Sequence, residues 1–222
     1  MFLSAKLIEN DYFCDMKLKE VILVGAGGHA LSIAEFAGER IFGYISNEKN
    51  EIFPGEWLGN DDMAPEWKSK GKKFHMAYVY SGLPVMKTRA KLIGLYESLG
   101  ADFVSVISPD AIITPSSDIG EGSAIMTGAI INRAKIGRNT IVNSGAIVEH
   151  DCIVGKNSFI GPGAVIGGFT SIGDNCFIGL GAKIGNGLKI GDNISVAMGA
   201  VVNKDLTEPG IYHGTPLKRF KI

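Results

Sequence analysis

The stretch IGRNTIVNSGAIVEHDCIVGKNSFIGPGAVIGGFTSIGDNCFIGLGAKIGNGLKI, residues 136–190, decides the fold. A β-branched aliphatic residue occupies every sixth position, glycine usually follows it, and the fifth residue of most units is small. The period continues beyond the stretch and gives twelve aliphatic positions in succession: Ile136, Val142, Val148, Val154, Ile160, Ile166, Ile172, Ile178, Ile184, Ile190, Val196 and Val202. The same period, one residue out of frame, precedes them at Ile113, Ile119, Ile125 and Ile131, which predicts a one-residue slip near 130–136.

A six-residue period is typical of a β-solenoid, in which each unit is a short strand and a turn. The aliphatic residue points inward and stacks on its equivalents in neighbouring coils, and glycine permits the turn. No unit buries its apolar side alone, so stacking supplies the core. This hexapeptide repeat resembles the left-handed parallel β-helix superfamily, with about 18 residues in each triangular coil and about five coils over 111–203. Glycine, at 30 of 222 residues, is about twice as frequent as usual, in agreement with many regular turns.

Residues 21–109 have a different pattern, which predicts a small Rossmann-like α/β domain. Four apolar segments indicate parallel strands: 21–25 (VILVG), 40–46 (RIFGYIS), 74–82 (FHMAYVYSG) and 102–108 (DFVSVIS). One helix is expected after the first strand and another over 87–99, where Leu92, Ile93, Tyr96 and Leu99 share a face and Gly100 can cap the end. The chain is therefore divided into an N-terminal extension (1–20), a Rossmann-like domain (21–109) and a β-helix domain (110–222).

The bulk composition excludes several classes of protein. Lys and Arg number 22 and Asp and Glu 23, so the basic footprint of a nucleic-acid-binding protein is absent. No apolar run is long enough for a transmembrane helix. Residues 1–20 make a poor signal peptide, and the two alternatives are that they form a docking extension or that Met16 is the natural start. The three cysteines, Cys14, Cys152 and Cys176, favour a reducing compartment, and we expect a cytoplasmic protein.

The repeat departs from its own rule in two adjacent units. Asn143 and Glu149 stand where glycine is usual, and His150 follows Glu149 as the only histidine inside the repeat. Its position at a corner predicts an outward-facing imidazole, with Gly168 beside it one coil later. Asp151 can accept a hydrogen bond from Nδ1 and raise the basicity of the ring, which leaves Nε2 as a general base. The alternative is a surface histidine–aspartate pair without a task.

Three segments carry a specific resemblance. Residues 143–152 (NSGAIVEHDC), 24–30 (VGAGGHA) and 210–216 (GIYHGTP) are similar to the corresponding segments of bacterial nucleotide-sugar acetyltransferases of the PglD/NeuD type. These enzymes use acetyl-CoA and act on UDP-, dTDP- or GDP-linked 4-amino-sugars, and sialic acid O-acetyltransferases are relatives. The resemblance extends over about 21–219 and implies a homotrimer with CoA in a groove between neighbouring subunits.

The resemblance also implies roles for individual residues. His150 would be the general base and Asp151 its partner, while Asn143 and Glu149 would line the acceptor pocket. The Rossmann-like domain would bind a nucleotide sugar rather than NAD, through the glycine turn and the ends of the next strands: Gly27, Gly28, His29, Ser46, Asn47, Ser81 and Gly82. Acetyl-CoA would lie against a third set of residues: Phe159, Gly168, Leu180, Ala197, Met198 and Lys218. Lys204, Lys218 and Arg219 are either CoA-phosphate ligands or solvated surface cations.

Three positions depart from the family pattern. Ser46-Asn47 replaces an acidic pair, Phe159 replaces a second histidine, and Ser108-Pro109 replaces His-Pro. A single repeat histidine cannot build the zinc site of the related γ-type carbonic anhydrases, so no metal is expected.

The leading hypothesis is therefore acetyl transfer from acetyl-CoA to the amine of a nucleotide-linked amino-sugar. The alternatives are an O-acetyltransferase acting on sialic acid or another glycan, and a nucleotide-sugar-binding scaffold without activity.

Overall fold

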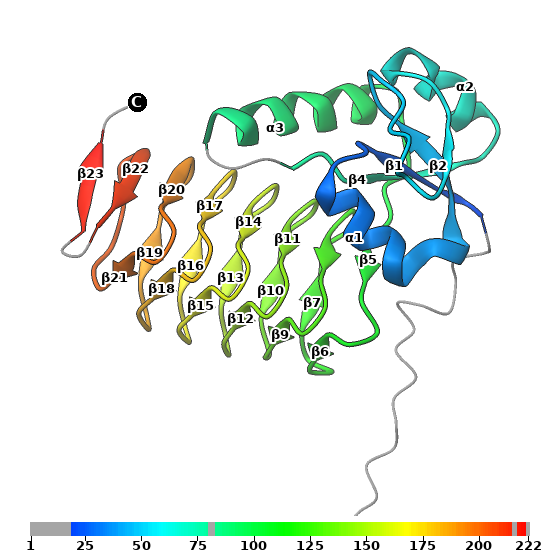
Figure 1. Cartoon of the computed structure of the whole chain (residues 1–222). Helices are drawn as coiled ribbons and strands as arrows, with labels where there is room; N and C mark the ends of the chain where they lie inside the picture. The colour runs from blue at the N-terminus through cyan, green and yellow to red at the C-terminus, as the bar shows by residue number, and fades with distance from the viewer. Residues whose placement is uncertain (1–18, 80–82, 215–216, 221–222) are drawn as a thin grey trace, which may run out of the picture.

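The computed structural model describes residues 19–79, 83–214 and 217–220, and its first part is a parallel four-stranded sheet (Figure 1). The strand order is β3-β2-β1-β4. The strands are β1 (Val21–Val24), β2 (Ile41–Ile45), β3 (Glu56–Trp57) and β4 (Lys73–Met76). All four residues of β1 are buried, as a continuous apolar run in a parallel sheet predicts.

Helices cover both faces of this sheet. Helix α1 (Gly28–Ala37) packs on one face, while α2 (Ala64–Ser69) and the C-terminal half of α3 (Leu83–Ser98) pack on the other. Two short 3-10 turns, η1 (Gly38–Arg40) and η2 (Asp61–Met63), connect these elements. The predicted helical cap at Gly100 is present, because this glycine has a φ of +65° and Ala101 N–H donates to the Tyr96 carbonyl at 3.0 Å. The expected Rossmann-like architecture is thus confirmed.

The prediction of one strand over 102–108 is wrong. Phe103 makes a single bridge to Phe74 at the edge of the four-stranded sheet. Strand β5 (Val106–Ile107) then pairs with the second part of the chain instead. Ile107 belongs to the core of that second part, so its burial there decides where the segment pairs.

The second part is a parallel β-helix with three faces. The eight-stranded face contains β5, β8 (Ala124–Ile125), β11 (Ile141–Val142), β14 (Phe159–Ile160), β17 (Phe177–Ile178), β20 (Ile194–Val196), β22 (Gly210–His213) and β23 (Lys218–Phe220). The six-stranded face contains β6 (Ile112–Ile113), β9 (Ile130–Ile131), β12 (Ile147–Val148), β15 (Val165–Ile166), β18 (Lys183–Ile184) and β21 (Val201–Val202). The five-stranded face contains β7 (Asp118–Ile119), β10 (Lys135–Ile136), β13 (Ile153–Val154), β16 (Ser171–Ile172) and β19 (Lys189–Ile190).

The pairing register confirms the slip that the sequence predicts. Ile112 pairs with Ile130, whereas Ile130 pairs with Ile147, so that one coil is a residue shorter than its neighbour. The inward aliphatic residues and the small residues at the corners are buried together in one continuous core. The eight-stranded face is covered by the first part of the chain, since Ile141 and Phe159 pack in the same cluster as α1 and Met86. Helix α3 runs lengthwise along the β-helix (Figure 1).

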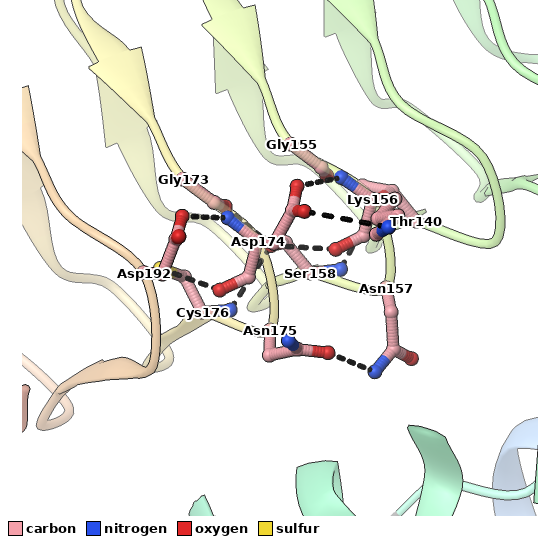
Figure 2. A network of polar contacts seen from close by, with 10 residues as sticks. All are labelled: Thr140, Gly155, Lys156, Asn157, Ser158, Gly173, Asp174, Asn175, Cys176 and Asp192. Atoms are coloured by element: carbon pink, nitrogen blue, oxygen red, sulfur yellow. Dashed lines mark hydrogen bonds and ion pairs between the residues drawn. The ribbon is translucent and has the colours of Figure 1, made fainter. Parts of the chain in front are cut away.

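The edge between the five-stranded and eight-stranded faces carries a regular polar network (Figure 2). Four asparagines at equivalent positions of successive coils have positive φ angles of 51–56°, a conformation that asparagine tolerates better than most residues. We call these residues the asparagine ladder: Asn139, Asn157, Asn175 and Asn193. Asn157 Nδ2 donates to Asn175 Oδ1 at 2.7 Å, and Asp174 Oδ1 accepts from Lys156 N–H at 2.9 Å. These bonds fix each corner on the next coil.

Two further observations concern cysteines and membranes. Cys152 and Cys176 are free and buried, while Cys14 lies outside the described residues. No helix among the described residues is long and apolar enough to span a membrane.

Candidate active site

His150 lies at the edge between the six-stranded and five-stranded faces, in the turn from β12 to β13. Its Nδ1 lies 3.0 Å from Asp151 Oδ2, and the imidazole is partly exposed. With the proton on Nδ1, the ring donates to the carboxylate, and Nε2 keeps a free lone pair. This arrangement is that of a base oriented by a carboxylate.

Asp151 is held from two sides. Its φ is +60°, and its second oxygen accepts from the Arg133 guanidinium at 3.1 Å. The hydrogen bond from His150 and, to a smaller extent, Arg133 lower the pKa of the Asp151 carboxyl below its usual range. The carboxylate therefore stays ionised at neutral pH, as a histidine partner must.

Gly168 provides the space that the imidazole occupies. A Cβ placed on Gly168 would lie 2.8 Å from His150 Nε2 and 2.9 Å from Cε1, so any larger residue would displace the ring. Phe169 follows it and meets the imidazole edge-on, with ring centroids 4.9 Å apart. Phe169 N–H also donates to the His150 carbonyl at 2.9 Å. The coil after His150 thus determines where the ring lies.

Glu149 and Asn143 lie on different edges of the β-helix. Glu149 Oε2 accepts from Asn132 Nδ2 at 3.2 Å and from the backbone N–H of His150 at 3.3 Å. Asn143 lies in the turn from β11 to β12, at the edge between the eight-stranded and six-stranded faces. Its Oδ1 accepts from Ser144 N–H at 2.7 Å. Only Glu149 therefore lies beside His150 within one chain.

A cleft of about 740 Å³ opens at the carboxyl ends of β1, β2 and β4 in the first part of the chain. Four residues that the sequence predicts for a nucleotide site line it, namely Gly27, His29, Ser46 and Asn47. Gly28 is exposed and does not line the cleft, and Ser81 and Gly82 lie outside the described residues. No side chain of the described residues caps the first turn of α1, so its backbone N–H groups face the mouth of the turn. A helix start of this kind attracts anions such as phosphate.

Gly25 shows why the turn is rich in glycine. Its φ is +112°, and a Cβ at this position would lie 3.0 Å from the Tyr78 backbone nitrogen. Only glycine lets the end of β4 pass this close.

The sequence analysis missed one wall of the cleft, which α3 supplies. Thr88, Lys91, Leu92 and Leu95 line it at the spacing of one helical face. That spacing is visible in the sequence, but the apolar pattern places Leu92, Ile93, Tyr96 and Leu99 on one helical face. The structure divides them, because Ile93 and Tyr96 are buried while Leu92 faces the cleft. Lys91 forms no ion pair among the described residues and places a cation on this wall.

A second, apolar groove of about 290 Å³ lies over the eight-stranded face and its edge with the six-stranded face. It is lined by Val79, Phe159, Pro162, Phe177, Gly179, Leu180 and Met198. Phe159 is buried and stacks on Phe177 with centroids 5.0 Å apart and planes at 3°. Leu180 and Met198 remain largely exposed, at 57% and 76%. Val79 also lines the cleft, so the two cavities meet at this residue.

The residues predicted for acetyl-CoA therefore divide into separate groups. Gly168 lies with His150 on one edge of the six-stranded face, whereas Leu180, Ala197 and Met198 lie on its other edge. The Ala197 N–H already donates to the Tyr212 carbonyl at 2.8 Å. Lys218 is exposed on β23 at the C-terminal end. Within one chain, the base and the apolar groove are not brought together.

Groups of three metal-ligating side chains do not occur among the described residues.

Comparison with known proteins agrees with this architecture. The family described as bacterial transferase hexapeptide (six repeats) matches residues 133–168, and the hexapeptide repeat of succinyl-transferase matches residues 169–204. The structure is similar to that of a variant of perosamine N-acetyltransferase from Caulobacter crescentus in complex with CoA and GDP-perosamine. The two are 30% identical with a TM-score of 0.83, and the match covers 91% of this chain and 97% of the other.

Two further structures are similar. The acetyltransferase domain of PglB from Neisseria gonorrhoeae, in complex with acetyl coenzyme A, is 25% identical with a TM-score of 0.83, over 92% of this chain and 100% of that domain. WeeI from Acinetobacter baumannii shares the fold at 24% identity and a TM-score of 0.73, over 90% of this chain and 99% of the other.

Proposed function

This chain belongs to the acetyl-CoA-dependent sugar N-acetyltransferases of the left-handed β-helix family, PglD/NeuD-like, and we propose that it acetylates the amine of a nucleotide-linked amino-sugar with His150 as the base. The observation that carries the proposal is the His150–Asp151 pair, hydrogen-bonded at 3.0 Å and seated against Gly168. The related enzyme bound to CoA and GDP-perosamine supports an acceptor of this class.

The proposed reaction is a direct transfer. The amine nitrogen attacks the thioester carbonyl, the new C–N bond forms, and the C–S bond breaks to release CoA. His150 Nε2 accepts the proton that the nitrogen loses, Asp151 stabilises the resulting imidazolium, and the imidazolium then gives the proton to the departing CoA thiolate. A positioned base of this kind contributes about 10²- to 10⁴-fold to the rate. Cys152 takes no part as a nucleophile, because it is buried and burial raises the pKa of its thiol.

The cleft supplies groups suited to a nucleotide diphosphate. The uncapped start of α1 offers backbone N–H donors, and Lys91 offers a positive charge on the opposite wall. His29 lines the same cleft, and burial lowers its pKa to about 3, so it is neutral there at pH 7. The amino-sugar would extend past Val79 towards the apolar groove, where the acetyl end of acetyl-CoA would lie.

We further propose a cyclic trimer as the active species. The outward residues of the six-stranded face are mostly apolar: Ile112, Ile130, Ile147, Val165, Lys183 and Val201. A face of this kind favours burial against another chain. His150 lies on one edge of that face, and Leu180 and Met198 lie on the other. A head-to-tail interface would therefore bring the base of one chain to the groove of its neighbour.

The proposal is tested by measuring CoA release from acetyl-CoA with a panel of acceptors. The panel contains UDP-, dTDP- and GDP-linked 4-amino-sugars, the matching sugars without the amine, and sialic acids. We expect release with an amino-sugar nucleotide and its loss in His150→Ala. Release only with sialic acid would instead identify an O-acetyltransferase. Near-normal activity in His150→Ala would contradict the assignment of the base.

A further inference from the structure

Arg89 is the largest fully buried side chain of the described residues, at 1% exposure. It projects from α3 towards the β-helix. One terminal nitrogen donates to the Asn139 carbonyl at 2.8 Å and also to Asn157 Oδ1, and the other donates to the Met76 carbonyl at 3.3 Å. The guanidinium thus joins three separate parts of the molecule, namely α3, the end of β4 and the asparagine ladder.

This cation is held by neutral oxygens. No carboxylate among the described residues forms an ion pair with Arg89. Burial of an uncompensated charge is costly, and here it lowers the pKa of Arg89 to about 9. An apolar residue would fill the same space without this cost, so stability alone does not account for an arginine here.

The residues that Arg89 contacts are next in the chain to residues that line the cleft and the apolar groove. Met76 is followed by Ala77, Tyr78 and Val79, which line the cleft, and Val79 lines the apolar groove as well. On α3, the neighbouring residues Thr88 and Lys91 form the opposite wall of the cleft. The same guanidinium therefore holds both the floor segment and the helical wall against the rigid β-helix.

We propose that Arg89 is a positioning residue for the acceptor: it fixes the cleft relative to the β-helix so that a bound nucleotide sugar is presented at the correct distance from the acyl donor. This inference rests on the proposed function. It adds that acceptor binding depends on Arg89, which does not itself line the cleft. Through Arg89, the asparagine ladder of the β-helix sets the position of the cleft walls.

Two histidines near Arg89 have buried Nε2 atoms, and His29 follows the glycine turn directly. His75 Nδ1 lies 2.9 Å from the Val104 carbonyl, while Nε2 of both His75 and His29 and Nε of Arg89 are buried and have no hydrogen-bond partner among the described residues. Burial is the main cause that lowers the pKa of both histidines, to about 3 for His29 and about 4 for His75; the charges of His75 and then Arg89 add to the effect on His29, and Arg89 adds to the effect on His75. The positive charge of Arg89 therefore favours the neutral form of both histidines.

The test compares Arg89→Lys with the wild-type chain in steady-state kinetics. Lysine keeps the charge and loses the fork of donors. We expect the KM for the nucleotide sugar to rise about tenfold or more, with the KM for acetyl-CoA within about twofold, because the groove is built mainly from β-helix residues. Asn157→Gly provides a second variant that suits the positive φ of 51° and removes the side-chain acceptor of Arg89 together with the Nδ2 donor to Asn175 Oδ1. It should raise the same KM several-fold.

Val142→Ala is the matched control for lost stability. Val142 is fully buried and belongs to the core cluster inside the β-helix. It should lower the thermal midpoint and leave both KM values unchanged. An unchanged nucleotide-sugar KM in Arg89→Lys would overturn the inference, as would an equal rise in both KM values. If Arg89→Lys does not fold, an unchanged KM in Asn157→Gly would overturn it.

A failure of the proposed function can be distinguished from a failure of the inference about Arg89. If the proposed function is wrong, the wild-type chain releases CoA with no member of the acceptor panel. In that case the comparison is made by calorimetry with UDP, GDP and dTDP. Weaker binding of the nucleoside diphosphate by both variants would support the role of Arg89. Equal binding, or no binding by any chain, would overturn it.

Discussion

The imidazole of His150 covers the α-carbon of Gly168, one coil further along the β-helix, so closely that a Cβ at Gly168 would lie 2.8 Å from Nε2. The position of the candidate base is therefore set by the absence of a side chain on the next coil. The ring can yield to a larger residue by turning outward, since it is the end of a rotatable side chain.

Gly168→Ala should separate activity from stability. The added methyl group displaces the imidazole from its place beside Asp151, and we expect kcat to fall about tenfold or more while the fold is retained. Steady-state kinetics and thermal unfolding of the same sample provide the two measurements. Gly94→Ala is the matched control, because a Cβ at this exposed helical glycine meets no atom within 4 Å. Unchanged kcat in Gly168→Ala would show that the ring position observed here is not needed for catalysis.

Asp151→Asn tests the partner of the base. Asparagine tolerates the φ of +60° and preserves the size of the side chain, but it removes the negative charge that stabilises a protonated His150. We expect kcat to fall about 10- to 100-fold with little change in either KM. Arg133→Gln serves as the control, since it breaks the exposed ion pair with Asp151 and leaves the His150 hydrogen bond in place. A fall of similar size in both variants would instead assign the effect to the ion pair.

Mixed oligomers test whether the site is shared between chains. His150→Ala removes the base on one edge, and Met198→Glu places a charge in the apolar groove on the other edge. Each variant alone should be nearly inactive. After co-refolding in equal amounts, about a quarter of the interfaces combine an intact His150 with an intact groove, and activity should return in proportion. No recovery in oligomers shown to contain both chains would contradict a site built from two subunits.

Stability should fall as the solution is acidified below neutral pH. His75 is fully buried and its pKa is lowered to about 4, mainly by burial, so the unfolded chain binds a proton that the folded chain does not. The contribution is complete above pH 6.5 and is lost between about pH 6.5 and 4, at up to about 1.4 kcal/mol per pH unit. Denaturant unfolding at several pH values measures this slope.

His75→Asn is the variant for the same experiment. Its amide nitrogen can replace Nδ1 as donor to the Val104 carbonyl, and it removes the titrating group. The slope should decrease relative to the wild-type chain, with His29 contributing the remainder. An identical slope in both chains would show that His75 does not titrate on unfolding.

The β-helix could be predicted closely because its period repeats a single physical requirement. Each inward position must be apolar and each corner small, so the pattern reveals the coil, the one-residue slip before Ile136 and the outward direction of His150. The segment 102–108 could not be assigned in this way. Its apolar residues suit either sheet, and only the burial of Ile107 in the solenoid core decides between them.

The cleft was predicted in part. The glycine turn identified Gly27 and His29, because a strand, a turn and a helix are adjacent in the sequence. Lys91 and Thr88 belong to a helix that reaches the cleft only after packing, and their role is not visible in a local motif. Phe159 was expected beside the acyl donor, and its stacking on Phe177 depends on register between two coils.

The sequence by itself determined the repeat, the place where the repeat is interrupted, and the residue types at the candidate base, because these follow from local spacing and side-chain chemistry. Only the tertiary structure decided which edges of the β-helix carry His150 and Met198, and that Arg89 holds the cleft on the asparagine ladder. The physical reason is that these relationships join residues from distant segments. They arise when α3 packs along the eight-stranded face and when each coil settles on the one before it.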